Sequence, residues 1–160
     1  MSFFTDIEDF HKKFGLTYDN NARQLPPDLI EFRIKFMTEE LDEYITYASE
    51  TAVELLTRTG DTLTGKDREP NKDAVVKGLE GQLDALVDLV YVALGTAYLQ
   101  GFKFDEAWAR VHRANMKKKK ALPDGSDSKR GSPHDVVKPE GWEAPSHTDL
   151  VSVNEHFPLP

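Results

Sequence analysis

The stretch IEFRIKFMTEELDEYITYA, residues 30–48, decides the fold because its apolar side chains recur every three or four residues. The recurring positions are Ile30, Ile34, Met37, Leu41, Ile45 and Ala48. That spacing places them along one face of an α-helix. Pro26 and Pro27 precede the stripe, and proline is well tolerated in the first turn of a helix. We therefore predict one long helix over residues 27–58.

A second apolar stripe predicts a second long helix over about residues 72–100. Its members are Val75, Leu79, Leu83, Leu86, Val90 and Leu94. The polar segment 59–71 between the two stripes contains Gly60, Gly65 and Pro70 and is predicted to be a loop. Gly101 stands where a left-handed residue commonly ends a helix.

Shorter patterns predict two more helices and a tail. The aromatic and apolar spacing of residues 1–14 indicates a short amphipathic helix. Asp105 is a candidate cap for a helix that ends in the lysine run 117–120, where lysines suit the negative end of the helix dipole. The inward-facing candidates on that helix are Trp108, Val111, His112 and Met116. Beyond Ala121 the chain is rich in Pro, Gly, Ser and Asp, which predicts an extended tail with Val136, Val137 and Trp142 as its anchors.

No strand-like alternation persists, so the predicted class is all-α, an antiparallel helical bundle. Helices this long expose more apolar surface than one chain can cover. We therefore expect oligomerisation, to a homodimer or homotetramer, to complete the bundle.

Composition excludes several classes of function. The 160 residues include no cysteine, which rules out disulfides, zinc–thiolate sites and thiol nucleophiles. The net charge of −8 argues against general binding of nucleic acid. The N-terminus lacks the apolar run of a secretory signal, and Asp84 and Asp88 make the most apolar stretch costly as a membrane span. A soluble, cytoplasmic protein with no membrane partner is the expectation.

Two groups of acidic residues lie on the predicted core helices. Glu40 and Glu43 are three residues apart and share a helix face, as do Asp84 and Asp88, four apart. No Lys or Arg lies between Lys35 and Arg58 or between Lys77 and Lys103, so basic partners within either helix are scarce. Convergent oxygens without nearby cations suit Mg²⁺ or Mn²⁺. The alternative is that these acids lie on a solvated rim or pair with Arg33, Arg110 or Arg113.

Four segments in this order resemble the MazG-like all-α NTP pyrophosphohydrolases, a superfamily that includes phosphoribosyl-ATP pyrophosphohydrolase and the dimeric dUTPases. They are EELDEY (39–44), DALVDLVYVALGTAYLQGF (84–102), WARVHRANMKKK (108–119) and VKPEGW (137–142). The resemblance covers about residues 7–145 and is closest to small bacterial and phage members. It implies a helical domain over residues 1–120 and a tail, 121–160, that docks over the active site.

The resemblance also implies a ligand set for Mg²⁺, because the family carries Glu-x-x-Glu on one helix and Glu-x-x-Asp on the next. Glu40 and Glu43 match the first pair, and Asp88 matches the final Asp. Ala85 stands at the remaining Glu position, so Asp84, one residue earlier, is the candidate replacement.

The implied reaction is attack of water between the α and β phosphates of a nucleoside triphosphate, which gives the monophosphate and pyrophosphate. Glu39 or Glu40 is the candidate to orient or deprotonate that water. Candidates for phosphate contacts are Arg113, Asn115, Lys117 and Lys138. Two alternatives stay open: hydrolysis of phosphoribosyl-ATP, and a non-catalytic helical dimer that acts as an interaction module.

Overall fold

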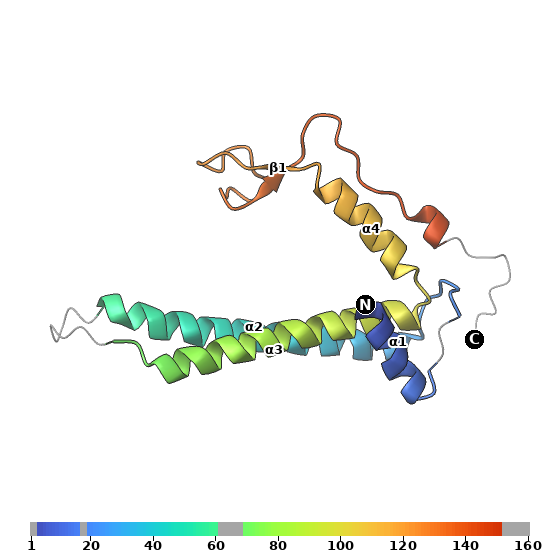
Figure 1. The fold of residues 1–160 in the computed structure, drawn as a ribbon, viewed down its shortest axis with the longest axis horizontal. Helices are drawn as coiled ribbons and strands as arrows, with labels where there is room; N and C mark the ends of the chain where they lie inside the picture. Colours follow the sequence, from blue (N-terminus) through green and yellow to red (C-terminus); the bar gives the residue numbers. More distant parts are fainter. Residues whose placement is uncertain (1–2, 17–18, 61–68, 152–160) are drawn as a thin grey trace. The chain divides into compact units, whose positions relative to one another are not determined.

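The computed structural model describes residues 3–16, 19–60 and 69–151. Within these ranges the chain forms four α-helices, two strands of two residues each and one 3-10 helix, so the predicted all-α class is confirmed (Figure 1). Most of the predicted loop 59–71 lies outside the described residues. The chain divides into two compact units, residues 1–16 with 24–99 and residues 17–23 with 100–160.

The first unit holds three helices: α1 (Phe3–Lys13), α2 (Pro27–Gly60) and α3 (Lys72–Leu99). The bounds of α2 and α3 lie within two residues of the predicted ones. Both long helices run side by side in opposite directions, and α1 packs on α3 (Figure 1). The buried side chains of α1 are Ile7 and His11, which lie one turn apart on the same face.

The two apolar stripes are only partly covered in the isolated chain. On α2, Ile34, Leu41 and Ile45 keep 46–55% of their surface exposed. On α3, Leu83 is 65% exposed, although the smaller Ala85 is buried. The stripes thus form helices as predicted, but their side chains leave an apolar face that the first unit does not cover.

Helix α3 also meets the length and composition of a membrane span in the described part of the chain. The core helix of a soluble protein passes the same test, so this feature carries little weight by itself.

The second unit contains α4 (Phe104–Asn115), β1 (Lys119–Lys120), β2 (Val136–Val137) and the 3-10 helix η1 (Thr148–Leu150). The strands are antiparallel, with Lys119 opposite Val137 and Lys120 opposite Val136. The sequence prediction missed this pair because two residues are too short to show alternation. The last two residues of the lysine run accordingly form β1, and the helix ends before the run begins.

Two further expectations for α4 are wrong. The helix begins at Phe104, and no side chain caps its N-terminus, so Asp105 is inside the first turn and is not the cap. Trp108 is 64% exposed and Met116 is 71% exposed, whereas the buried residue of this helix is Ala114. Val111 and His112 are exposed as well. An amphipathic pattern does not reveal which neighbours are present to cover it.

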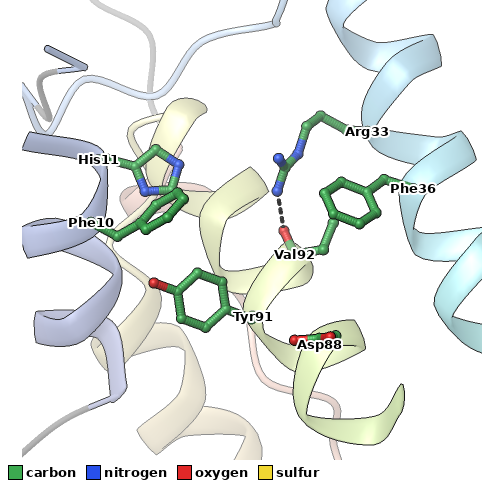
Figure 2. A pocket seen from close by; sticks show the side chains of 7 residues that line it. All are labelled: Phe10, His11, Arg33, Phe36, Asp88, Tyr91 and Val92. Atoms are coloured by element: carbon green, nitrogen blue, oxygen red, sulfur yellow. Dashed lines mark hydrogen bonds between the residues drawn. The ribbon is translucent and has the colours of Figure 1, made fainter. Parts of the chain in front are cut away.

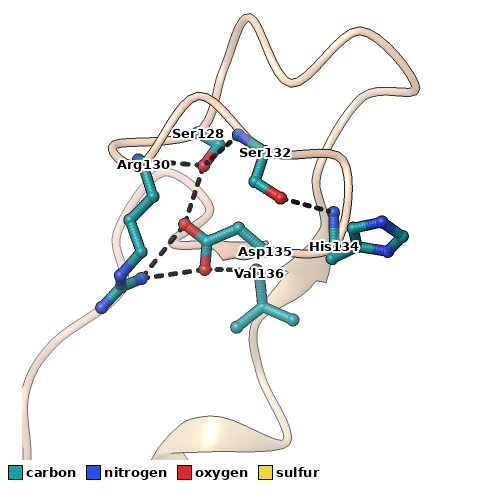
Figure 3. Close-up of polar contacts among 6 residues, drawn as sticks. All are labelled: Ser128, Arg130, Ser132, His134, Asp135 and Val136. Carbon is teal, nitrogen blue, oxygen red and sulfur yellow. Dashed lines mark hydrogen bonds and ion pairs between the residues drawn. The ribbon is translucent and has the colours of Figure 1, made fainter. Parts of the chain in front are cut away.

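Hydrogen bonds order the tail segment between the two strands (Figure 3). The Asp135 carboxylate accepts from the Ser128 hydroxyl at 2.7 Å, the Val136 backbone N–H at 2.8 Å and Arg130 Nη1 at 2.9 Å. These bonds, that from Ser128 foremost, lower the pKa of Asp135. Further along, Arg110 donates two bonds of 2.6 Å to the Asp149 carboxylate. The extended tail is therefore held by its polar side chains, whereas Val136, one of its predicted apolar anchors, is 52% exposed.

Gly101 should tolerate alanine poorly. Its φ is +69°, and an added Cβ would overlap the carbonyl oxygen of Asn21, which belongs to the same unit. We expect Gly101→Ala to lower the free energy of unfolding by about 2–4 kcal/mol, from backbone strain plus overpacking, as measured by urea denaturation. Gly131 has a φ of +62° but open space around it, so Gly131→Ala should cost only the backbone part, about 1–2 kcal/mol. Equal losses in both variants would contradict this account.

Candidate active site

The predicted acidic residues lie on the two long helices of the first unit. Glu39, Glu40 and Glu43 are on α2, and Asp84 and Asp88 are on α3. Glu40 is the buried member, with 8% of its surface exposed, and the other four are exposed. In the isolated chain, the alternative that the acids lie on a solvated rim therefore holds for those four residues. It fails for Glu40, which is buried.

The carboxyl group of Glu40 is influenced by the negative charges of the other four residues. The pKa of Glu40 is raised above its ordinary value, first because burial removes the carboxyl from water and second because Asp88 is negatively charged nearby. The remaining acids act in the same direction; in decreasing order they are Glu43, Glu39 and Asp84. Carboxylates from both helices thus lie within electrostatic reach of one buried Glu. Asp84 is one of these neighbours of Glu40. It directly precedes Ala85, the position at which the family has a Glu.

Basic residues do not neutralise the cluster. Among the described residues, the ion pair that involves this cluster joins Lys35 Nζ to Glu39 Oε1 at 3.8 Å. Both of these side chains are exposed. Two of the three arginines considered as partners bond elsewhere. Arg33 donates to the Val92 carbonyl and the Thr96 hydroxyl, and Arg110 pairs with Asp149. The repulsion at Glu40 is therefore left without a compensating cation from α2 or α3.

The donor set suits a hard divalent cation by its chemistry. All five residues offer carboxylate oxygens, which Mg²⁺ and Mn²⁺ prefer, and a cation would relieve the repulsion at Glu40. Among the described residues, however, no group of three or more His, Asp or Glu side chains is close enough to hold a metal ion. The assignment of Glu40, Glu43, Asp84 and Asp88 as ligands stays a prediction.

The predicted phosphate contacts all belong to the second unit, and one of them, Lys138, lies against Trp142. The indole Nε1–H donates to the Ala114 carbonyl at 2.8 Å, which holds the tail against the end of α4. Lys138 Nζ lies 4.5 Å from the centre of the same ring. Arg113 and Asn115 flank Ala114 in the chain, and Lys117 follows shortly after; these three side chains and Lys138 are exposed. Trp142 is confirmed as a tail anchor, whereas the substrate contacts stay a prediction.

A pocket of about 160 Å³ opens beside Asp88 in the first unit (Figure 2). All three helices of this unit line it, with aromatic rings from each and with Arg33 and His11 among the polar groups. In the sequence-based predictions Arg33 is named only as a possible partner for carboxylates. Its spacing nevertheless indicates that it lies on the packed face of the helix, because Arg33 follows Ile30 by three residues and precedes Met37 by four. An arginine at stripe spacing lies on the packed side of its helix.

The geometry agrees with the comparison to known families. The model of the family PRA-PH, phosphoribosyl-ATP pyrophosphohydrolase, matches residues 7–115. No curated protein matches the chain. The fold is that of a MazG-like all-α pyrophosphohydrolase, a hydrolase that acts on acid anhydrides. Within that class, the chain belongs to the PRA-PH family.

The raised pKa of Glu40 predicts how stability depends on pH. The folded chain holds the Glu40 proton more tightly than the unfolded chain does, so stability falls as the pH rises above the ordinary value of 4.5. Glu40→Gln copies the protonated form and should raise the melting temperature at pH 7 in the absence of metal, by about 2 °C. The difference should vanish near pH 4. Glu50→Gln, exposed on the same helix, is the control. Lower stability of the Gln variant at pH 7 would show that ionised Glu40 has a cationic partner.

Proposed function

We propose that the protein is a Mg²⁺-dependent nucleoside triphosphate pyrophosphohydrolase that converts a (d)NTP and water to the (d)NMP and pyrophosphate. A role in cleaning the nucleotide pool of the cytoplasm follows from this activity. The observation that carries the proposal is the unneutralised cluster around Glu40, on two helices that lie within the family match. A site that repels its own carboxylates gains free energy when it binds a divalent cation together with its polyphosphate ligand.

In this proposal Glu40, Glu43, Asp84 and Asp88 hold the cation, with Mn²⁺ able to replace Mg²⁺. The bound ion supplies neutralisation of phosphate oxygens and a lower pKa for the attacking water. Glu39 or Glu40 orients that water and accepts its proton. Asp84 has a shorter reach than the family Glu would have at Ala85, which is buried, so it is the ligand whose loss should be felt least.

The candidates for phosphate contacts in this proposal are Arg113, Lys117 and Lys138, and Asn115 is the candidate for a neutral hydrogen bond. Trp142 supports the arrangement because it bonds to Ala114 and lies against the Lys138 ammonium group. Most of the catalytic contribution is then positional and electrostatic, as phosphoryl transfer requires.

The second candidate function is hydrolysis of phosphoribosyl-ATP, which the description of the matching family supports. The two substrates share a triphosphate chain cut at the same place, so the carboxylate cluster serves either one. A non-catalytic interaction module is the third reading, in which Ala85 marks a metal site that has been lost.

Substrate profiling separates these candidates. We expect pyrophosphate and a monophosphate from at least one common (d)NTP with Mg²⁺, and a loss of about 100-fold or more in Glu40→Gln and in Asp88→Asn. Glu50→Gln is the matched control and should keep full activity. Turnover of phosphoribosyl-ATP alone would select the second candidate, and no release from any nucleotide with Mg²⁺ or Mn²⁺ would select the third. Robust activity in both site variants would refute the assigned site.

We also propose that the exposed apolar face of α2 and α3 is covered by a second copy of the chain. Many large apolar side chains are left about half-exposed on this pair of helices, and a soluble monomer rarely exposes so large an apolar surface. Either a homodimer or a homotetramer would cover this face.

Sedimentation equilibrium tests the oligomer. The wild-type protein is expected at twice the 18.1 kDa chain mass or more. Leu83→Glu introduces a charge at a position that is 65% exposed in the isolated chain, so the chain should fold and sediment as a monomer. Leu122→Glu, at a 51% exposed position in the tail, should leave the mass unchanged. A monomeric wild-type protein would overturn the proposal.

A further inference from the structure

One indole ring in the second unit has two ammonium groups beside it. Lys138 Nζ lies 4.5 Å from the centre of the Trp142 ring, and Lys118 Nζ lies 5.6 Å from the same centre. An aromatic ring attracts a cation that lies within about 6 Å of its centre, so both lysines are in range. Trp142 therefore stabilises two positive charges at one place on the tail.

The strand register places the same two lysines opposite each other. Lys119 of β1 pairs with Val137 of β2, so the next pair along these antiparallel strands is Lys118 with Lys138. Residues directly opposite each other on antiparallel strands point to the same face, and like charges there repel each other. The backbone thus brings two ammonium groups to one side of the strand pair, where their repulsion is unfavourable.

Hydrogen bonds at two points fix Trp142 beside this pair. Its indole Nε1–H donates to the Ala114 carbonyl at the end of α4, over 2.8 Å. Its backbone N–H donates to the Pro139 carbonyl over 3.1 Å and closes a turn in which Gly141 has a φ of +72°. A positive φ at the third residue is typical of a type II turn. The turn leads the chain from Lys138 back to Trp142.

Carboxylates do not neutralise these lysines. Arg110 and Arg130 in the same unit have carboxylate partners, Asp149 and Asp135. Neither lysine forms such an ion pair with any residue that the structure describes. The sequence around the first of them adds to the positive charge, since residues 108–123 include six Lys or Arg and no Asp or Glu. Binding of an anion would relieve this repulsion.

We infer that Lys118 and Lys138 form a binding site for a phosphate group and that Trp142 is its positioning residue. Two ammonium groups suit a compact oxyanion with two negative charges, because each acts as a point charge with three donors. A nucleobase fits less well, since the ammonium groups already lie beside the ring on which it would stack. The site lies beyond residue 115, where the family match ends.

The phosphate group has two possible sources. One is the polyphosphate of a bound nucleotide, in which case the inference rests on the proposed function. The other is free pyrophosphate, the product of that reaction. Lys118 is not among the predicted phosphate contacts, because the sequence does not show which lysine of the run 117–120 lies beside Trp142.

Titration with inorganic pyrophosphate tests the site without catalysis. The chain has two tryptophans, so a ¹H–¹⁵N spectrum contains two indole N–H resonances, and Trp108→Phe assigns them. In the metal-free wild-type protein, pyrophosphate should move the Trp142 resonance in a saturable manner. The resonance of Trp108, which is 64% exposed, should stay in place. A Trp142 resonance that does not move, or that moves equally with thymidine, would overturn the site.

Substitution of single lysines tests which charges bind the anion. Lys118→Met and Lys138→Met each remove one charge and keep a long side chain, and each should weaken pyrophosphate binding by about tenfold in calorimetry. Lys120→Met removes a charge from the same run at an exposed position on β1 and is the matched control. Equal weakening in all three variants would indicate general attraction to the basic run and would overturn the site.

Two substitutions of Trp142 test its positioning role. Trp142→Phe keeps an aromatic face and loses the bond to Ala114, whereas Trp142→Leu loses both. Both variants should lose similar stability in urea denaturation, but pyrophosphate should bind the Phe variant several times more tightly than the Leu variant. Equal affinities in the two variants would leave Trp142 as a tail anchor only.

Kinetics separate the two sources and the two proposals. If the site binds the nucleotide's polyphosphate, Lys118→Met should raise KM for the (d)NTP; if it binds the product, the variant should instead weaken inhibition by pyrophosphate. Pyrophosphate binding beside Trp142 in a protein that hydrolyses no nucleotide would refute the hydrolase and leave the site. Hydrolysis without a Trp142 shift, and with unchanged kinetics in Lys118→Met, would overturn the site and leave the hydrolase.

Discussion

The repulsion among carboxylates on α2 and α3 is the interaction on which the proposed chemistry of this protein depends. Glu40 is withdrawn from water and has Asp88 as its strongest charged neighbour, and no described basic residue forms an ion pair with either of them. Such an arrangement destabilises the folded state, and a stable protein keeps it when the binding of a ligand offsets this loss of stability. The chain belongs to a family of pyrophosphohydrolases, which in general use divalent metal ions. In the proposed function such an ion is the ligand that these acids bind.

The long pairing of α2 with α3 makes this repulsion possible. Two antiparallel helices hold side chains from distant parts of the chain opposite one another along their length. A single pair, however, has one inner face and leaves residues such as Leu83 in water. The same geometry that builds the site therefore creates the apolar surface that we propose a second copy covers.

Two kinds of polar group serve different purposes in the first unit. In the proposed site the carboxylates act by their net charge, and Asp84 stands one residue before the family's Glu position at Ala85. His11 and Arg33 are each oriented by backbone or hydroxyl partners and so offer hydrogen bonds in fixed directions.

The sequence by itself determined the helices of the first unit, the family and the acidic residues of the candidate site. Stripes such as Ile30 to Ala48 repeat over many turns, and the acids differ from their apolar neighbours in kind, so both signals are local. Tertiary structure alone decided that Glu40 is buried while Asp84 and Asp88 are exposed, and that His11 and Arg33 meet over Gly95. It also decided the short pairing of β1 with β2 and the exposure of Trp108. Whether a residue is buried, and which residues it contacts, depends on the element that packs against it. The periodicity along one helix does not identify that element.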